Sequence, residues 1–226
     1  MKRSRLLIQK LKEAEVPQVV FFVNGRYACA QNGFKHIQLY TEAGHLIANH
    51  SYHHRSLENR NAVSFANDIL KADNILKNIP NFRKWYRFPM LNEGNTREKR
   101  DYIRSLLKRH GYINGCVTID NWDFYMDQLL KKGLSKGKKL NKANLRRLYL
   151  EYVWNAIEFY DNIARQYYPH PLKHTLLLHD NDVTAMFIKD LVDLIREKGW
   201  IIISPEDAYK DNLVNIAPDV LMNNQG

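Results

Sequence analysis

Residues 43–54 read Ala43-Gly-His-Leu-Ile-Ala-Asn-His-Ser-Tyr-His-His54, with three histidines in the last five positions. A neutral imidazole is a ready ligand for zinc or a similar cation, and two imidazoles four residues apart project the same way in a helix or tight turn. His50 and His54 are therefore candidate metal ligands. Histidines in a polar loop are, however, more often exposed to solvent than bound to a metal, so the flanking sequence has to distinguish the two interpretations.

The residues before these histidines favour a ligand site. The segment from Gly44 to Asn49 reads as a short buried strand that ends in a polar edge. Enzymes built on parallel sheets place their ligands at such strand ends. The segment therefore predicts a strand that is followed directly by a site.

The rest of the chain alternates between strand and helix patterns. Continuous apolar runs predict strands at 19–23, 46–48, 85–88, 116–119, 175–178 and 200–203. Apolar residues at helical spacing predict helices at 3–14, 34–41, 64–76, 96–110, 143–168 and 183–197. Such alternation, with strands apolar on both faces, indicates a parallel α/β arrangement in which residues 1–226 form one domain. The pattern fits either a doubly wound sheet or a barrel.

Two finer expectations concern residues 131–168. The segment 131–142 carries six lysines and two glycines, which is typical of a solvated loop. The long helix after it is expected to pack through an apolar stripe formed by Leu145, Leu148, Tyr152, Val153, Ala156, Tyr160, Ile163 and Tyr167.

Composition and charge limit the class of protein. The chain has 226 residues, 45% of them hydrophobic, which is enough for a full core. It has no apolar run of about 18 residues, so no transmembrane segment is predicted. The apolar stretch after its basic start is too short for a signal-peptide core. The net charge of +10 favours an acidic partner such as an anionic glycan, nucleic acid or lipid headgroups, but no nucleic-acid-binding motif is present.

Polar clusters also follow three later predicted strands. They are Arg87-Phe-Pro-Met-Leu-Asn-Glu-Gly94, Asp120-Asn-Trp-Asp-Phe124 and Leu176-Leu-Leu-His-Asp-Asn181. Each has a structural alternative: a turn with a surface arginine, a carboxylate that caps the next helix, and a histidine satisfied within the fold. Coincidence explains four clusters at four strand ends poorly, so we expect them to contribute to a site.

The order of these motifs resembles that of the polysaccharide deacetylases, the NodB-homology or carbohydrate esterase family 4 enzymes. The family's Gly-His-x-Ile-x-Asn-His-Ser/Thr-x-x-His motif is similar to residues 44–54, and its Leu-x-His motif is similar to residues 177–179. The family's Arg-x-Pro motif resembles residues 87–89. Its Asp-x-x-Asp-Trp motif resembles residues 120–124, with Phe124 in place of the tryptophan.

This resemblance implies an irregular (β/α) barrel with a groove at the carboxyl ends of its strands. It assigns a divalent cation, expected to be Zn²⁺, to His50 and His54. It assigns the role of general acid to His179, tuned by the carboxylate of Asp123, while Arg87 orients the catalytic base. The substrate contacts implied by the resemblance are those of Leu177, Leu178, Phe124, Trp122 and Pro89.

One family motif has no counterpart in this sequence. Thr-Phe-Asp-Asp, which supplies the family's catalytic base and third metal ligand, belongs on a first strand ahead of the first helix, and no aspartate precedes Asp68. The barrel is therefore expected to lack its first strand here. Three explanations stay open: the sequence starts late, the protein is a degenerate homologue, or another acid takes over, the candidates being Glu42, Glu93, Asp180 and Asp182.

The sequence thus predicts a metal-dependent hydrolase that removes acetyl groups from N-acetylated sugars of a polysaccharide or peptidoglycan-type glycan, impaired by the missing aspartates. One rival is a glycan-binding homologue without catalysis. Another, which rests on charge alone, is a nucleic-acid-associated protein. The resemblance also implies a location in the cell envelope or periplasm.

Overall fold

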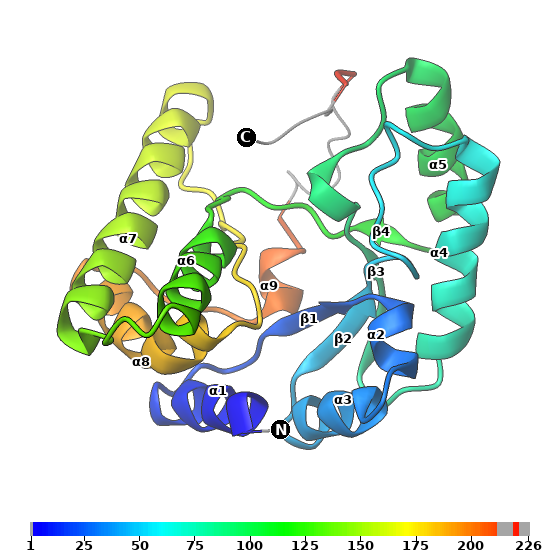
Figure 1. Ribbon diagram of the computed structural model, residues 1–226. Coiled ribbons are helices and arrows are strands. Elements are labelled where there is room, and N and C mark those ends of the chain that lie inside the picture. Colours follow the sequence, from blue (N-terminus) through cyan, green and yellow to red (C-terminus); the bar gives the residue numbers. More distant parts are fainter. Residues whose placement is uncertain (1, 212–218, 222–226) are drawn as a thin grey trace. The chain divides into compact units, whose positions relative to one another are not determined.

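A computed structural model describes residues 2–211 and 219–221, and the chain forms an α/β protein (Figure 1). It divides into two compact units. The helical unit contains Met1–Pro17 and Val117–Ser204, and the sheet unit contains Gln18–Cys116 and Pro205–Gly226. Every described helix is too short or too polar to cross a bilayer.

In its described part, the sheet unit is built on a four-stranded parallel sheet with the strand order β1-β2-β3-β4. The strands are β1 (Val20–Val23), β2 (Leu46–Asn49), β3 (Phe82–Tyr86) and β4 (Ile113–Asn114). β2 is buried along its whole length, as expected of a central strand covered on both faces. Val23 pairs with Asn49 at the end of the β1–β2 register, so the loops after these two strands leave the sheet side by side.

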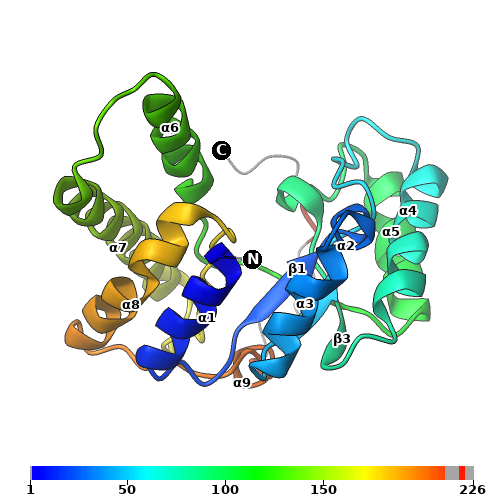
Figure 2. The same cartoon turned by 60° about the horizontal axis from the view of Figure 1, so that its bottom comes forward.

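Helices cover this sheet (Figures 1 and 2). α3 and α4 pack on β2, and α4 also packs against α2 and α5. A core cluster that includes Leu57, Ile69 and Tyr86 lies beneath α4 and α5. The helices are α2 (Gly25–Cys29), α3 (Gly33–Glu42), α4 (Ala62–Leu76), α5 (Arg97–Arg109) and α9 (Pro205–Ala208), with a 3-10 turn η1 (Pro89–Leu91).

The helical unit is organised around α8 (Asp182–Glu197), which packs against α1 (Lys2–Glu13), α6 (Asp123–Ser135) and α7 (Lys142–Tyr167). Figures 1 and 2 both show α1 beside α8. Half of α8 is buried, including Val183 and Leu191. All six predicted helices are confirmed to within two residues at each end.

Several strand predictions were wrong in extent. The runs 116–119 and 175–178 are hydrogen-bonded to each other but form no strand beyond one parallel bridge, between Ile119 and Leu176. The run 200–203 forms no strand, and Ile201 is 84% exposed. The strand predicted at 85–88 lies earlier, at Phe82–Tyr86. An apolar run supplies side chains for a core, but a strand also needs a neighbouring ladder, which the run itself does not reveal.

Both expectations for residues 131–168 also need correction. Residues 131–135 are not a loop but the end of α6, whereas residues 136–141, between α6 and α7, are the exposed loop that was predicted. On α7 the buried residues are Tyr149, Val153, Ile157 and Ala164, and of the predicted stripe only Val153 is buried. α7 carries apolar residues on more than one face, so helical spacing alone fits two different stripes.

Candidate functional site

The loop after β2 places the histidine pair at the carboxyl edge of the sheet. The backbone N–H of His50 donates to the carbonyl of Val23 at 3.0 Å, and its ring Nδ1 lies 2.8 Å from the carbonyl oxygen of Arg87. A carbonyl only accepts, so this contact places the proton on Nδ1. The Nε2 lone pair of neutral His50 is then directed to the other side of the ring.

The ring of His54 lies on the side to which this lone pair points. Its Nε2 atom lies 3.0 Å from Nε2 of His50. Two nitrogens bound tetrahedrally to one zinc ion at the usual bond length are about 3.3 Å apart. The pair therefore fits two ligand positions around a cation. Among residues 2–211 and 219–221, no group of three His, Cys, Asp or Glu side chains is arranged to hold a metal.

The loop reaches this geometry through strained backbone. Ser51 and His54 both have left-handed conformations, with φ of 64° and 55°. Each costs about 1–3 kcal/mol outside glycine unless the surroundings impose it. Here the side-chain oxygen of Asn49 accepts from the N–H of Ser51 at 2.9 Å, and the hydroxyl of Ser51 accepts from the N–H of His54 at 3.1 Å.

Two supporting residues of this loop were not predicted as site residues. Asn49 is fully buried and also donates to the carbonyl of Ile69 and the hydroxyl of Tyr112. Gly25 donates its N–H to the carbonyl of Ser51, and a Cβ there would lie 2.7 Å from the Tyr52 ring. Both occur next to polar strand ends in the sequence, which is the signal that could have identified them.

Arg87 and Pro89 occupy the loop after β3, in the same unit. The Arg87 guanidinium lies 3.8 Å from the centre of the Phe22 ring, and its Nε donates to the carbonyl of Gly115 at 2.9 Å. Pro89 is buried at the start of η1. The carbonyl of Arg87 links it to the histidine pair, because it accepts from Nδ1 of His50 and so orients that ring.

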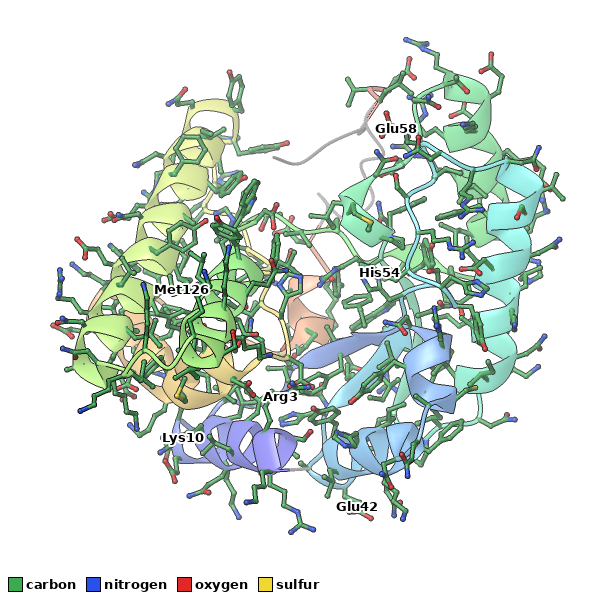
Figure 3. All side chains as sticks on the ribbon, viewed as in Figure 1. Arg3, Lys10, Glu42, His54, Glu58 and Met126 are labelled. Atoms are coloured by element: carbon green, nitrogen blue, oxygen red, sulfur yellow. The ribbon has the colours of Figure 1, made fainter. Side chains whose placement is uncertain are left out.

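The alternative acids have other surroundings. Figure 3 shows Glu42 at the end of the sheet opposite His54, and β2 separates the two by about 13 Å of strand. Glu93 is buried and pairs with Arg104 at 2.6 Å. In the helical unit, Asp180 pairs with Arg3 at 2.9 Å, and Asp182 lies 3.4 Å from Lys131.

Asp123 and His179 are brought together within the helical unit. Asp123 begins α6 and is fully buried. Its carboxylate accepts from the ring Nδ1 of His179 at 2.6 Å and from the backbone N–H of His179 at 2.9 Å. The side chains of Asn181 and Thr184 each donate to it at 2.9 Å. With Nδ1–H directed to Asp123, the Nε2 atom of His179, whose side chain is 43% exposed, is available to exchange a proton.

Aromatic side chains border His179. The ring of Phe124 lies 5.2 Å from the imidazole, edge to face, and the ring of Trp122 lies 6.0 Å from Phe124. Trp122 is 45% exposed, so it offers a surface for a ligand. Leu177 and Leu178, on the segment that leads to His179, are half-buried.

Comparisons with known proteins support the fold. The family profile described as polysaccharide deacetylase matches residues 2–114. A CE4-family pseudoenzyme from Bacillus anthracis has a TM-score of 0.63 at 14% identity, with 92% of this chain and 60% of that chain covered. A family 4 carbohydrate esterase from Streptomyces lividans in complex with acetate has a TM-score of 0.60 at 18% identity, with 92% of this chain and 90% of that chain covered. A peptidoglycan deacetylase from Bacillus subtilis has a TM-score of 0.60 at 16% identity, with 95% of this chain and 88% of that chain covered.

The chain spans about three fifths of the pseudoenzyme structures that it resembles. No curated protein sequence matches it. At these identities the structural likeness concerns the fold, and it confirms the expected α/β fold of the NodB type.

Proposed function

Because the chain belongs to the polysaccharide deacetylase family, we propose that it is a metal-dependent hydrolase that removes acetyl groups from N-acetylated sugars of a polysaccharide or peptidoglycan-type glycan. The main support is the histidine pair, in which strained backbone directs two Nε2 atoms to within 3.0 Å of each other. Strain of this kind persists where the surroundings impose it and is concentrated at functional sites.

His50 and His54 would hold the cation. When bound, a divalent ion there supplies Lewis-acid chemistry, polarising the acetyl carbonyl and lowering the pKa of water. The carbonyl of Arg87 keeps the proton of His50 on Nδ1 and so keeps Nε2 available. With two described ligands, we expect weak metal affinity.

His179 is the proposed proton donor to the departing amine. Asp123 fixes its ring through the 2.6 Å bond to Nδ1, so that Nε2 faces outward with the proton to be transferred. The rings of Phe124 and Trp122 form the neighbouring apolar wall, and we propose that they contact the sugar or its acetyl group.

Acetate release from a chitooligosaccharide in the presence of Zn²⁺ or Co²⁺ tests these roles. His179→Ala should lower turnover by about 10²–10⁴-fold, the usual contribution of a general acid, without changing metal content. His50→Ala should remove both activity and bound metal. His170→Ala, at an exposed histidine of the helical unit, is the control for His179→Ala, and His110→Ala, at an exposed histidine of the sheet unit, is the control for His50→Ala. Unchanged acetate release in His179→Ala or His50→Ala would contradict the assignment.

A glycan-binding protein without catalysis is the second candidate. It is favoured by the finding that the described residues offer two imidazoles and no third His, Cys or acidic ligand beside them. Binding of chitooligosaccharide by the unmodified protein, with no acetate released at any Zn²⁺ or Co²⁺ concentration, would favour this candidate. For either function we propose the cell envelope or periplasm as the location, which cell fractionation tests.

A further inference from the structure

A basic cavity lies beside the histidine loop, entirely within the sheet unit. It has a volume of about 240 Å³ and is lined by His53, Arg55, Arg60, Ser64, Phe65, Asn67, Asp68 and Lys71. Pockets for drug-sized ligands are about 300–1,000 Å³. The cavity therefore suits one small charged group better than a whole oligosaccharide.

One wall of the cavity is a face of α4. Ser64, Asp68 and Lys71 follow one another at spacings of four and three residues, so they share one side of the helix. The first turn of α4, capped by Asn61, lies at the same end as Ser64. The positive end of the helix dipole therefore adds to the cationic character of the cavity.

The other wall is the loop that continues from the histidine pair. Leu57 is fully buried in the core cluster, and the ammonium of Lys99 donates to the carbonyl of Glu58 at 2.7 Å. These two anchors hold the segment that carries Arg55 and Arg60. The backbone between Arg55 and Arg60 is therefore tied to the core of the sheet unit.

The charges of the cavity do not cancel. Arg55, Arg60 and Lys71 form no ion pair with any described residue, although Lys71 lies 3.7 Å from the centre of the Tyr52 ring. Asp68 is the one acid of the lining, and its carboxylate is already engaged by the His53 ring at 2.5 Å and by the N–H groups of Tyr52 and His53. Burial raises the pKa of Asp68, but these bonds outweigh it and leave the pKa below its usual value.

With His53 neutral, the lining carries a formal excess of two positive charges. Two guanidinium forks and one ammonium match the oxygens of a phosphate group, since arginine binds phosphate in a bidentate manner. His53 is the chain neighbour of His54, with Cα atoms about 3.8 Å apart, so the cavity and the histidine pair share one loop.

We propose that this cavity binds a phosphate monoester carried by the sugar of the glycan substrate. The inference rests on the proposed function for the identity of the carrier, but phosphate recognition itself depends only on the cavity. Arg55 and Arg60 are specificity residues here, and neither belongs to the histidine pair.

Calorimetric titration with N-acetylglucosamine 6-phosphate, N-acetylglucosamine and inorganic phosphate at low ionic strength tests the proposal. The phosphorylated sugar should bind at least about tenfold more tightly than either other probe, because it combines both groups. The double variant Arg55→Gln/Arg60→Gln should lose at least about tenfold in affinity for it. The control Lys35→Gln/Arg109→Gln removes the same charge from exposed positions outside the cavity and should change the affinity less than about twofold.

Equal losses in the two double variants would overturn the proposal, because they would show attraction by net charge alone. Inorganic phosphate that binds as tightly as the phosphorylated sugar would overturn the glycan as carrier. If a single-stranded oligonucleotide bound more tightly than the phosphorylated sugar and depended on Arg55 and Arg60, the carrier of the phosphate would be nucleic acid and not a glycan. Acetate release measured on the same preparations keeps the questions separate: its absence together with arginine-dependent binding contradicts the deacetylase function and supports the cavity.

Discussion

The Asp123 centre of the helical unit and the histidine loop of the sheet unit reach fixed geometries by different means. Asp123 is fully buried, and its carboxylate accepts four hydrogen bonds from three residues. The histidine loop is half-buried at both imidazoles and depends on two left-handed residues, Ser51 and His54, whose N–H groups donate to the side chains of Asn49 and Ser51. The first arrangement is a saturated polar network, and the second is a strained turn.

This difference separates stability from function in the two regions. Loss of one partner in a saturated buried network leaves several donors without an acceptor, so the fold suffers along with the proton donor. Loss of one partner in the strained turn releases strain as well as a bond, so we expect a smaller loss of stability and a specific loss of metal binding. Mutations at the Asp123 centre should therefore mainly lower the free energy of unfolding, whereas mutations in the histidine loop should mainly lower metal affinity.

Asp123→Ala should have the largest effect. It leaves the ring and backbone N–H of His179, together with Asn181 and Thr184, without their acceptor, and each buried donor left unpaired costs about 1–3 kcal/mol. Urea unfolding measures the loss. Asp120→Asn, at a half-buried carboxylate in the same motif, is the control and should change the free energy of unfolding by less than about 1 kcal/mol. Equal losses in the two variants would show that the buried network is not special.

Asn49→Ala should have an intermediate effect on stability and a stronger one on metal binding. The substitution leaves the buried N–H of Ser51 without its acceptor, which costs about 1–3 kcal/mol. The released turn should lower Zn²⁺ affinity, measured by competition with a chelating dye. Asn78→Ala, at an exposed position, should change neither quantity. Zn²⁺ affinity that survives in Asn49→Ala would mean that the turn does not position the imidazoles.

The sequence could predict most helices and the convergence of particular side chains, but less of the sheet. Helical spacing placed α8 correctly because one strong apolar stripe exists there. On α7 the spacing placed the helix to within one residue at each end but misassigned its buried face, where Leu148 is exposed and Tyr149 is buried, because two faces are apolar. β4 has two residues, too few to leave any periodic signal.

The candidate site shows a similar division. The residues with the chemistry were predictable, since His50 and His179 stand in recognisable motifs after apolar runs. The supports were less so, because the role of Asn49 depends on Tyr112, which is 63 residues away in the chain. The basic cavity was also missed, since it joins a loop to a helix face that no motif marks.

The smallest effect that we expect is a loss of stability at low pH. It can be compared between the two units through one buried histidine in each, His45 and His174. Burial lowers the pKa of His45, which directly precedes β2, and no acidic group in the described part of the chain opposes the shift. In the helical unit burial also lowers the pKa of His174, but the carboxylate of Asp161 opposes the shift. We therefore expect the sheet unit to respond to acid more strongly than the helical unit.

The sign follows from proton linkage. With the folded pKa of His45 below its unfolded value, the unfolded chain binds more protons, so stability is complete above the unfolded pKa and is lost as pH falls towards the folded one. Between pH 7.5 and 5.5, amide exchange at Leu46–Asn49, corrected for intrinsic rates, should therefore accelerate more than exchange in α8. His45→Phe keeps an aromatic ring beside Phe21 and should remove most of that acceleration, whereas His110→Phe should not. If the acceleration persisted unchanged in His45→Phe, other groups of the sheet unit would cause the acid sensitivity.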